Sequence, residues 1–457
     1  MKAQAGAGSA DPILVKPPTA WWAVFVFTII STINYLDRQV MTLMITPIKQ
    51  DLGLSDTQVS LLIGFMFVIF YLAVGIPVSR LVDRGPRKWL LGAGVAFWSV
   101  MTACCGLASN FWQMAIARMG VGVGESCNTP AVFSMLSDMF PRDKLAAATS
   151  AVGLGVSFGS GIALFVGGVL LVWLTDLGHT TWPLVGTLAP WQMTFILVSL
   201  PGIFVAILTL ATVPEPPRRG EAGRTIDVPK MGQVLRYMAQ WRGAFVPIVI
   251  GIGVKAMLSF GTSVWGPSLF ERKFGWEPGT PGLYMGMVYL IAAPIGTMTG
   301  GLLADHLARR GDKAAYMRVV LWASFGVLPG AVLFPLMPTG ALSLFFLGVS
   351  LFFGAMGAGP GNAAVQIISP GRMRGTIVAL YFALFNVMGY GLGPLVVARI
   401  TEVGFGDPNM LPMAICITAA ALGPLGILFS WMAIRPYVAA ADALDAATAR
   451  RSRSGSD

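Results

Sequence analysis

The chain has 457 residues, of which 55% are hydrophobic and 11% are charged, and its mean hydropathy is +0.71. Apolar residues fall into runs of about 20, the length that crosses roughly 30 Å of hydrocarbon, so a soluble globular protein is excluded. The net charge of +10 does not indicate nucleic-acid binding, because Lys and Arg cluster in alternate loops rather than along one helix face. The four cysteines lie in apolar segments without metal-ligand spacing, so no metal, disulfide framework or cofactor is expected.

The apolar runs predict an all-α polytopic membrane protein with about twelve transmembrane helices in two pseudo-symmetric halves of about six. The helices are expected to begin near Trp21, Asp56, Trp89, Phe111, Leu145, Trp191, Ala244, Gly282, Ala315, Ala341, Thr376 and Leu411.

These helices divide the chain into two bundles, residues 21–213 and 242–436, with tails at 1–20 and 437–457. The polar segment 214–241 between them is rich in proline and charge, which rules out a membrane span. Its second part, Val228 to Tyr237, is predicted to form a short amphipathic surface helix. The first residues lack the layout of a signal peptide, so the first helix is expected to stay in place.

Loop charge predicts the orientation of the chain. With both termini in the cytoplasm, the inside loops carry most basic residues, as the positive-inside rule requires of an inner (plasma) membrane protein. These are Arg80, Arg84, Arg87, Lys88, Arg142, Lys144, Arg218, Arg219, Arg224, Lys230, Arg309, Arg310, Lys313, Arg372 and Arg374. The outside loops hold mainly Lys49, Arg272, Lys273 and Arg399, with acids near each.

The two halves share a loop pattern. Asp83 and Arg84 follow the second helix, and Asp305 and Arg309 follow the eighth, so each loop has a carboxylate at a helix end and then a basic turn. An ordinary stop-transfer charge cluster is the alternative, but recurrence at the same place favours a two-repeat fold. We expect these four residues to gate by latching helices in one conformation, and a single chain to be the working unit.

Five ionisable residues lie deep in predicted helices: Asp37, Arg38, Arg118, Glu125 and Lys255. Unpaired, they would cost about 12–17 kcal/mol in a bilayer, so they are expected to pair or to face a polar cavity. The depths estimated for the first and fourth helices agree within about 3 Å, which makes an ion pair between Asp37 and Arg118 geometrically possible.

Each buried charge has a structural alternative and a functional one. Asp37 and Arg38 point about 100° apart, so two ion pairs that only hold helices together are one possibility. Glu125 has fewer obvious partners, and a carboxyl without a fixed cation suits proton uptake and release, so Glu125 and Asp37 are predicted to couple protons. Arg118 is predicted to be the main anion clamp, with Arg38 and Lys255 as further substrate contacts.

Three sequence features resemble the major facilitator superfamily across nearly the whole chain: the paired acid-then-basic loops, the glycine-rich run from Arg118 to Glu125, and the six-plus-six layout. Asn34-Tyr35-Leu36-Asp37-Arg38 and Ser137-Asp138-Met139-Phe140-Pro141 are similar to the spinster-like branch, whose animal members export sphingosine-1-phosphate or lysophospholipids. Anion:cation symporters share the first string.

The resemblance implies a central cavity lined by helices 1, 4, 7 and 10. The buried charges fall on helices 1, 4 and 7, while Asn362 and Gln366 on helix 10 and Asn386 on helix 11 are further substrate-binding candidates or satisfied structural amides. Ser79 and Pro86 replace usual loop glycines, and Gly159-Ser160-Gly161 stands where drug antiporters commonly have Gly-Pro.

The leading interpretation is a secondary transporter that works by alternating access, with proton coupling and an anionic amphipathic lipid as substrate. Three buried cations against two buried acids favour an anion, and no phosphate-binding loop for ATP is present. A small organic-anion symporter is the alternative within this class. An enzyme lacks a suitable grouping around His179, His306 or the cysteines, and a receptor would show no net flux.

Overall fold

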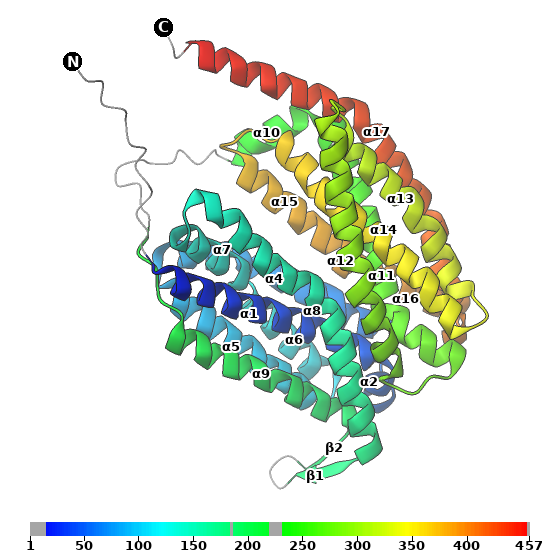
Figure 1. The fold of residues 1–457 in the computed structure, drawn as a ribbon. Coiled ribbons are helices and arrows are strands. Elements are labelled where there is room, and N and C mark those ends of the chain that lie inside the picture. The colour runs from blue at the N-terminus through cyan, green and yellow to red at the C-terminus, as the bar shows by residue number, and fades with distance from the viewer. Residues whose placement is uncertain (1–14, 183–185, 219–230, 455–457) are drawn as a thin grey trace.

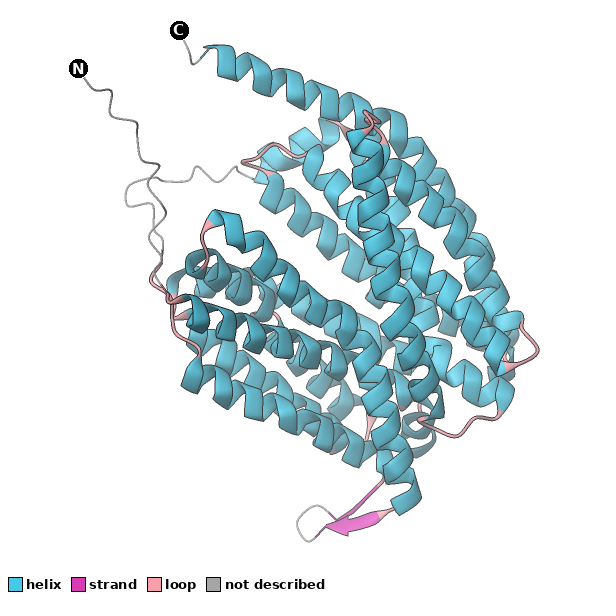
Figure 2. Ribbon diagram, viewed as in Figure 1, coloured by secondary structure: helices cyan, strands magenta, loops and turns pink. Residues whose placement is uncertain are grey.

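The computed structural model describes residues 15–182, 186–218 and 231–454. Nearly all of these residues are helical, and a small hairpin is the exception (Figure 2). The predicted all-α fold is thereby confirmed. Parts of the predicted tails and of the linker, including Arg219, Arg224 and Lys230, lie outside the described residues.

The first group of helices runs from the start of the described chain to Thr212. Its elements are α1 (Pro17–Leu43), α2 (Ile45–Leu52), α3 (Asp56–Ser60), the π-helix η1 (Leu61–Phe65), α4 (Met66–Arg84), α5 (Arg87–Gly106), α6 (Phe111–Glu125), α7 (Asn128–Met139), α8 (Arg142–Leu177), β1 (Thr180–Trp182), β2 (Gly186–Leu188) and α9 (Pro190–Thr212). The strands pair antiparallel, with Thr181 opposite Thr187.

The second group follows the linker. It contains α10 (Met231–Gln240), α11 (Arg242–Phe274), α12 (Thr280–Arg309), α13 (Ala315–Leu333), η2 (Phe334–Leu336), α14 (Gly340–Ile367), α15 (Arg374–Asn386), the π-helices η3 (Val387–Leu392) and η4 (Ile400–Phe405) on either side of α16 (Gly393–Arg399), η5 (Pro408–Met410) and α17 (Leu411–Ser454).

Eleven helical stretches in the described ranges are long and apolar enough to cross a membrane. The expected helix at Phe111 is present as two pieces, because α6 ends at Glu125 and α7 begins at Asn128. Each predicted helix begins within about four residues of its expected start, and several begin at a proline, which is preorganised for the first helical turn.

We call the end of the bundle where α1 begins and α17 ends the terminal face, and the opposite end, with α2 and the β1–β2 hairpin, the distal face (Figure 1). The two groups of helices converge toward the distal face (Figure 1). There, a Cβ atom added to Gly64 in η1 would lie 1.9 Å from the carbonyl oxygen of Tyr390 in η3. A Cβ on Gly168 in α8 would lie 2.7 Å from the Gly279 carbonyl oxygen, so these contacts between the groups require glycine.

At the terminal face, α10 lies against the second group. Val234 of α10 is buried in one cluster with Phe245, and the Tyr237 hydroxyl donates a hydrogen bond of 2.8 Å to the Ile368 carbonyl at the end of α14. Burial raises the pKa of the Tyr237 hydroxyl, so it stays a donor across the physiological range. α17 continues past the membrane segment, with Tyr437 in the same cluster.

Candidate functional site

The central ion pair joins Arg38 of α1 to Glu125 of α6. Arg38 Nη2 and Nε lie 2.6 Å and 2.7 Å from the same Glu125 oxygen, Oε2. The Glu125 side chain is 0% exposed and that of Arg38 is 10% exposed. Because Glu125 Oε1 has no hydrogen-bond partner among the described residues, the carboxylate depends on Arg38 alone for ionic compensation at short range.

Glu125 lies where α6 ends and α7 begins. Ser126 and Cys127 between them keep right-handed helical backbone angles, so the two pieces follow each other closely. The complete burial of the carboxylate explains why it needs a cation. The glycine-rich segment before Glu125 allows close packing, since a Cβ on Gly122 would lie 2.7 Å from the Phe67 carbonyl oxygen.

Four aromatic rings surround the Arg38 guanidinium. Its Cζ atom lies 4.6 Å from the ring centroid of Phe67, 5.4 Å from that of Tyr71, 5.7 Å from that of Tyr35 and 5.8 Å from that of Tyr390. Tyr390 comes from the second group of helices, so this cation contacts rings from both groups. Aromatic faces stabilise a desolvated cation by about 2 kcal/mol each at best, without consuming its hydrogen-bond donors.

The predicted ion pair between Asp37 and Arg118 does not form. Arg118 is 1% exposed, and it donates to two backbone carbonyls, at 3.4 Å to Asp37 and at 3.5 Å to Leu62. The Asp37 side chain is 0% exposed, and within the described chain neither of its oxygens accepts a hydrogen bond. Glu125, which was expected to have fewer obvious partners and no fixed cation, pairs with Arg38, because Arg38 turns toward α6 while Asp37 points elsewhere around α1.

Lys255 is not brought to the Arg38 pair. Its Nζ atom lies 3.5 Å from the Val320 carbonyl of α13, and a Cβ on Gly357 of α14 would approach it to 3.4 Å. Lys255 therefore lies among helices of the second group, and it forms no ion pair with the described part of the chain.

The three candidate amides do not form one site. Asn362 and Gln366 line a cavity of about 370 Å³ near the terminal face, together with Tyr316 and Arg374. Asn386 donates to the Phe382 carbonyl in its own helix at 2.8 Å. The structure thus groups two of the three amides and leaves Asn386 as an ordinary helix-surface contact.

The predicted latch residues lie at the terminal face without joining one another. Asp83, Arg84 and Arg309 are exposed, and Asp305 accepts a hydrogen bond of 3.2 Å from the Tyr316 hydroxyl. In the conformation described, the charge network of this face centres instead on Arg87.

Arg87 is 1% exposed and binds the Asp138 carboxylate, with its Nε 3.0 Å from Glu215 Oε1. Sequence reasoning counted Arg87 only as loop charge. The sequence signal for this ion pair was Asp138, which lies in the motif from Ser137 to Pro141.

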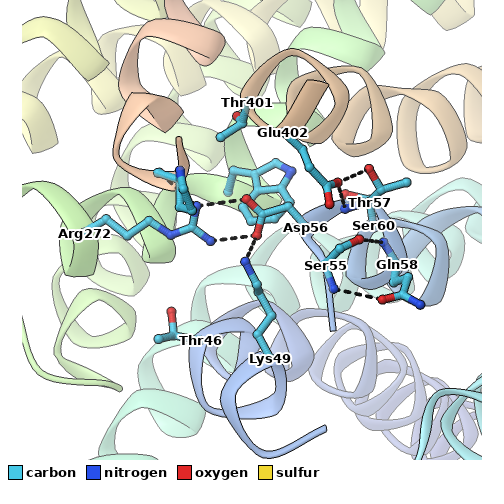
Figure 3. A network of polar contacts seen from close by, with 12 residues as sticks. Thr46, Lys49, Ser55, Asp56, Thr57, Gln58, Ser60, Arg272, Thr401 and Glu402 are labelled. Carbon is cyan, nitrogen blue, oxygen red and sulfur yellow. Dashed lines mark hydrogen bonds and ion pairs between the residues drawn. The ribbon is translucent and has the colours of Figure 1, made fainter. Parts of the chain in front are cut away.

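A second network missed from the sequence joins the two groups at the distal face (Figure 3). Asp56 of α3 is 3% exposed and accepts both ends of the Arg272 fork, at 2.9 Å and 3.0 Å, while Lys49 also binds it. Glu402 of η4 accepts from the Thr57 backbone at 3.0 Å and from its hydroxyl. The acids noted beside the outside basic residues were the signal, but their partners come from distant segments.

With this geometry in place, residues 27–397 match the family model of the Major Facilitator Superfamily. The chain belongs to this superfamily. It is therefore a multi-pass membrane transporter of the major facilitator class, and not an enzyme.

Relatives within the superfamily differ in their names. An MFS-type efflux pump of Mycolicibacterium smegmatis is 28% identical over 425 residues, covering 92% of this chain and 94% of that protein. The Drosophila melanogaster protein spinster is 23% identical over 397 residues, covering 84% of this chain and 62% of that one. The probable L-galactonate transporter of Escherichia coli K12 is 24% identical over 430 residues, covering 87% and 86%.

Among solved structures, a bacterial homolog of the human lysosomal transporter Spinster, in an inward-facing and unoccupied conformation, has a TM-score of 0.77. It is 24% identical in sequence, and the match covers 94% of this chain and 98% of that one. This likeness establishes the major facilitator fold.

Proposed function

We propose that this major facilitator protein is a proton-coupled transporter of an anionic amphipathic lipid, such as a lysophospholipid or a sphingoid phosphate. The observation that carries the proposal is the buried pair of Arg38 and Glu125, held by one carboxylate oxygen beneath aromatic rings. A guanidinium matches phosphate in geometry and charge, so a substrate anion competes directly with Glu125 for Arg38.

Competition for one cation links substrate to proton. When the anion takes Arg38, the buried Glu125 carboxylate at the end of α6 loses its ionic partner, and protonation removes the cost of leaving that charge unpaired. Binding reciprocity then requires a protonated Glu125 to favour anion binding at Arg38. Asp37, equally buried and without hydrogen-bond partners in the described chain, is the second protonation site.

Two cations are candidates for the anion clamp. Arg38 is the more reachable at 10% side-chain exposure, whereas Arg118 is 1% exposed and holds backbone carbonyls. Arg38 is thus the first contact and Arg118 the deeper one. Lys255 contacts helices of the second group and does not contact this pair of arginines.

Loop charge supports an orientation with the terminal face in the cytoplasm of a cell with an inner membrane. Residues 21–213 and 242–436 then rock as two units about a central path, joined by the linker 214–241. Since one chain supplies both units, a monomer suffices for transport. The ion pair of Asp56 with Arg272 and the hydrogen bonds of Thr57 to Glu402 join the groups at the distal face, which supports a conformation closed at that face and open toward the cytoplasm.

The aromatic surroundings of Arg38 favour a substrate that carries an apolar tail next to its anionic head. A small organic anion is the alternative, supported by the relative named as a probable L-galactonate transporter. Both substrates use the same cation. A receptor without net flux would belong to a different class of protein.

Flux into proteoliposomes under an imposed pH gradient tests the proposal. We expect gradient-driven movement of sphingosine phosphate or lysophosphatidic acid, with galactonate moved far less well. Glu125→Gln and Asp37→Asn should each fold yet lose the response to the gradient, and Arg118→Lys should transport at least about tenfold more slowly. Native gradient-driven flux in both carboxylate variants contradicts the coupling, and preferential galactonate flux selects the alternative substrate.

A further inference from the structure

We propose that the cavity at the terminal-face end of α14 is a second anion site, which binds a phosphate ester or carboxylate that also carries hydroxyl groups. The proposal rests on the transport function above, and it assigns the site that the substrate head meets before Arg38. Its lining residues include Tyr316, Asn362, Gln366 and Arg374.

The space is suited to a small polar head. The volume of about 370 Å³ lies within the roughly 300–1,000 Å³ range of small-molecule sites. Asn362 and Gln366 are one helical turn apart, so both amides share a face of α14. Gly359 adjoins them, and a Cβ added there would meet no atom within 4 Å, so the site keeps open space beside the amides.

The lining residue Arg374 brings a positive charge to this cavity that no counter-charge in the described ranges pairs with. Arg374 is the first residue of α15, where the helix dipole is also positive, and the first turn of that helix holds no acid. The guanidinium is exposed and forms no ion pair with the described residues. An arginine in this position is destabilised by the helix dipole, and a bound anion offsets that cost.

Two other lining residues offer acceptors. Asn362 Oδ1 is buried and has no hydrogen-bond partner in the part of the chain that the structure describes. The Tyr316 hydroxyl gives its proton to Asp305 at 3.2 Å, so its oxygen is left to accept. The negative charge of Asp305 disfavours an anion beside Tyr316, so the proposal places the anionic group of the ligand at Arg374 and its hydroxyls at Tyr316 and Asn362.

Two sources share this chemistry. The glycerol phosphate head of a lysophospholipid carries a phosphate and neighbouring hydroxyls, and a sugar acid carries a carboxylate and hydroxyls. Isothermal titration of the full chain in detergent at low salt, with sn-glycerol 3-phosphate and with galactonate, distinguishes them. A tighter glycerol phosphate complex indicates the lipid head, and a tighter galactonate complex indicates the acid.

The test compares matched variants. Arg374→Gln should weaken binding of the preferred probe by at least about tenfold, because a charged hydrogen-bonding partner is lost. Arg372→Gln, two residues earlier and not a lining residue, should stay within about twofold. Gly359→Leu should block the cavity, whereas Gly301→Leu, at another helical glycine with open space, should not.

The hydroxyl contacts have their own readout. Propyl phosphate, which has no hydroxyl beyond its phosphate, should bind wild type more weakly than glycerol 3-phosphate by about threefold or more, and Asn362→Ala should erase that difference. Absence of binding by every probe, or equal losses in Arg374→Gln and Arg372→Gln, overturns the site.

Failure of the site is separable from failure of the transport proposal. Arg38→Gln should leave probe binding at Arg374 unchanged while transport is lost. Binding that depends on Arg374 in a protein without flux refutes the transport function and keeps the site. Proton-driven flux whose KM and kcat are unchanged by Arg374→Gln, together with no probe binding, refutes the site and keeps the transport function.

Discussion

The central pair and the distal-face network are both charged and both mostly buried, but the first lies within one group of helices and the second joins the two groups. Arg38 and Glu125 belong to one group of helices, and their contact depends on a single oxygen. Asp56 and Arg272 join the two groups through a bidentate fork, with Lys49 as a second cation. In the proposed rocking of the two groups, a pair within one group persists and suits ligand exchange, whereas a pair between groups breaks in every cycle.

The terminal face completes this comparison. Its ion pairs, such as those of Arg87 with Asp138 and of Lys313 with Asp442, each stay within one group of helices in the described ranges, and Arg87 also binds Glu215 of the linker. Ion pairs that cross between the groups therefore mark the closed face, and their loss at the distal face is expected to accompany opening there.

The largest effect is expected at the central pair. Arg38→Gln leaves a buried carboxylate at the end of α6 without a cation, which should lower the free energy of unfolding by about 3–5 kcal/mol and abolish anion transport. The double variant Arg38→Gln with Glu125→Gln should recover most of the stability but not the transport. Thermal unfolding and flux measure both, and an Arg38→Gln protein as stable as wild type contradicts the dependence of Glu125 on this one cation.

The next effect concerns the close approach of η1 and η3. In Gly64→Ala the new Cβ meets the Tyr390 carbonyl oxygen at 1.9 Å, and both sides are backbone, so the groups must separate. Such overpacking costs about 1–3 kcal/mol, or roughly five- to 150-fold in a conformational equilibrium. Labelling of Ser60→Cys by a water-soluble maleimide, in a background without other cysteines, should rise accordingly.

Gly75→Ala in α4 is the matched control for this change, because a Cβ there meets no atom within 4 Å. Ser60 is 0% exposed and donates to the Pro394 carbonyl across the groups, so its labelling reports opening. Equal labelling in the Gly64 and Gly75 variants would show that the distal face is not held at η1 and η3.

A smaller effect is expected at the distal network. Asp56→Asn removes the negative charge that Arg272 and Lys49 share. After the cost of desolvation, we expect the free energy that favours the closed distal face to fall by about 1 kcal/mol, which corresponds to roughly fivefold more Ser60→Cys labelling. Asp51→Asn serves as control, since Asp51 accepts from Trp191 at 2.6 Å within the first group. If Asp51→Asn opens the face equally, closure depends on net charge rather than on the cross-group fork.

The smallest effect is expected at Thr57. Its contact with Glu402 also crosses the groups, but it is exposed to solvent, where water replaces the lost hydroxyl. Thr57→Ala should change the labelling rate by less than about twofold, and Thr57→Ser should match wild type. A rise in labelling rate in Thr57→Ala as large as that in Asp56→Asn would show that the two distal contacts stabilise the closed face equally.

The sequence by itself determined that the chain is built of long apolar helices, and it gave their order and approximate starts. Length and hydropathy predict helices of about 20 residues or more, and proline at the first position limits where a helix begins, as at Pro17 and Pro190. The burial of Asp37, Arg38, Arg118 and Glu125 followed from the same reasoning, and all four are at most 10% exposed in their side chains or as whole residues.

Only the tertiary structure decided which charges meet. Position along a helix axis is set by counting residues, but direction around the axis depends on the packing of neighbours and on breaks such as the one after Glu125. Arg38 therefore pairs with Glu125, for which few partners were expected, and Arg118 donates to backbone carbonyls rather than to Asp37. Contacts such as Asp56 with Arg272, 216 residues apart, arise because two separately encoded groups of helices close on one face, which no local pattern specifies.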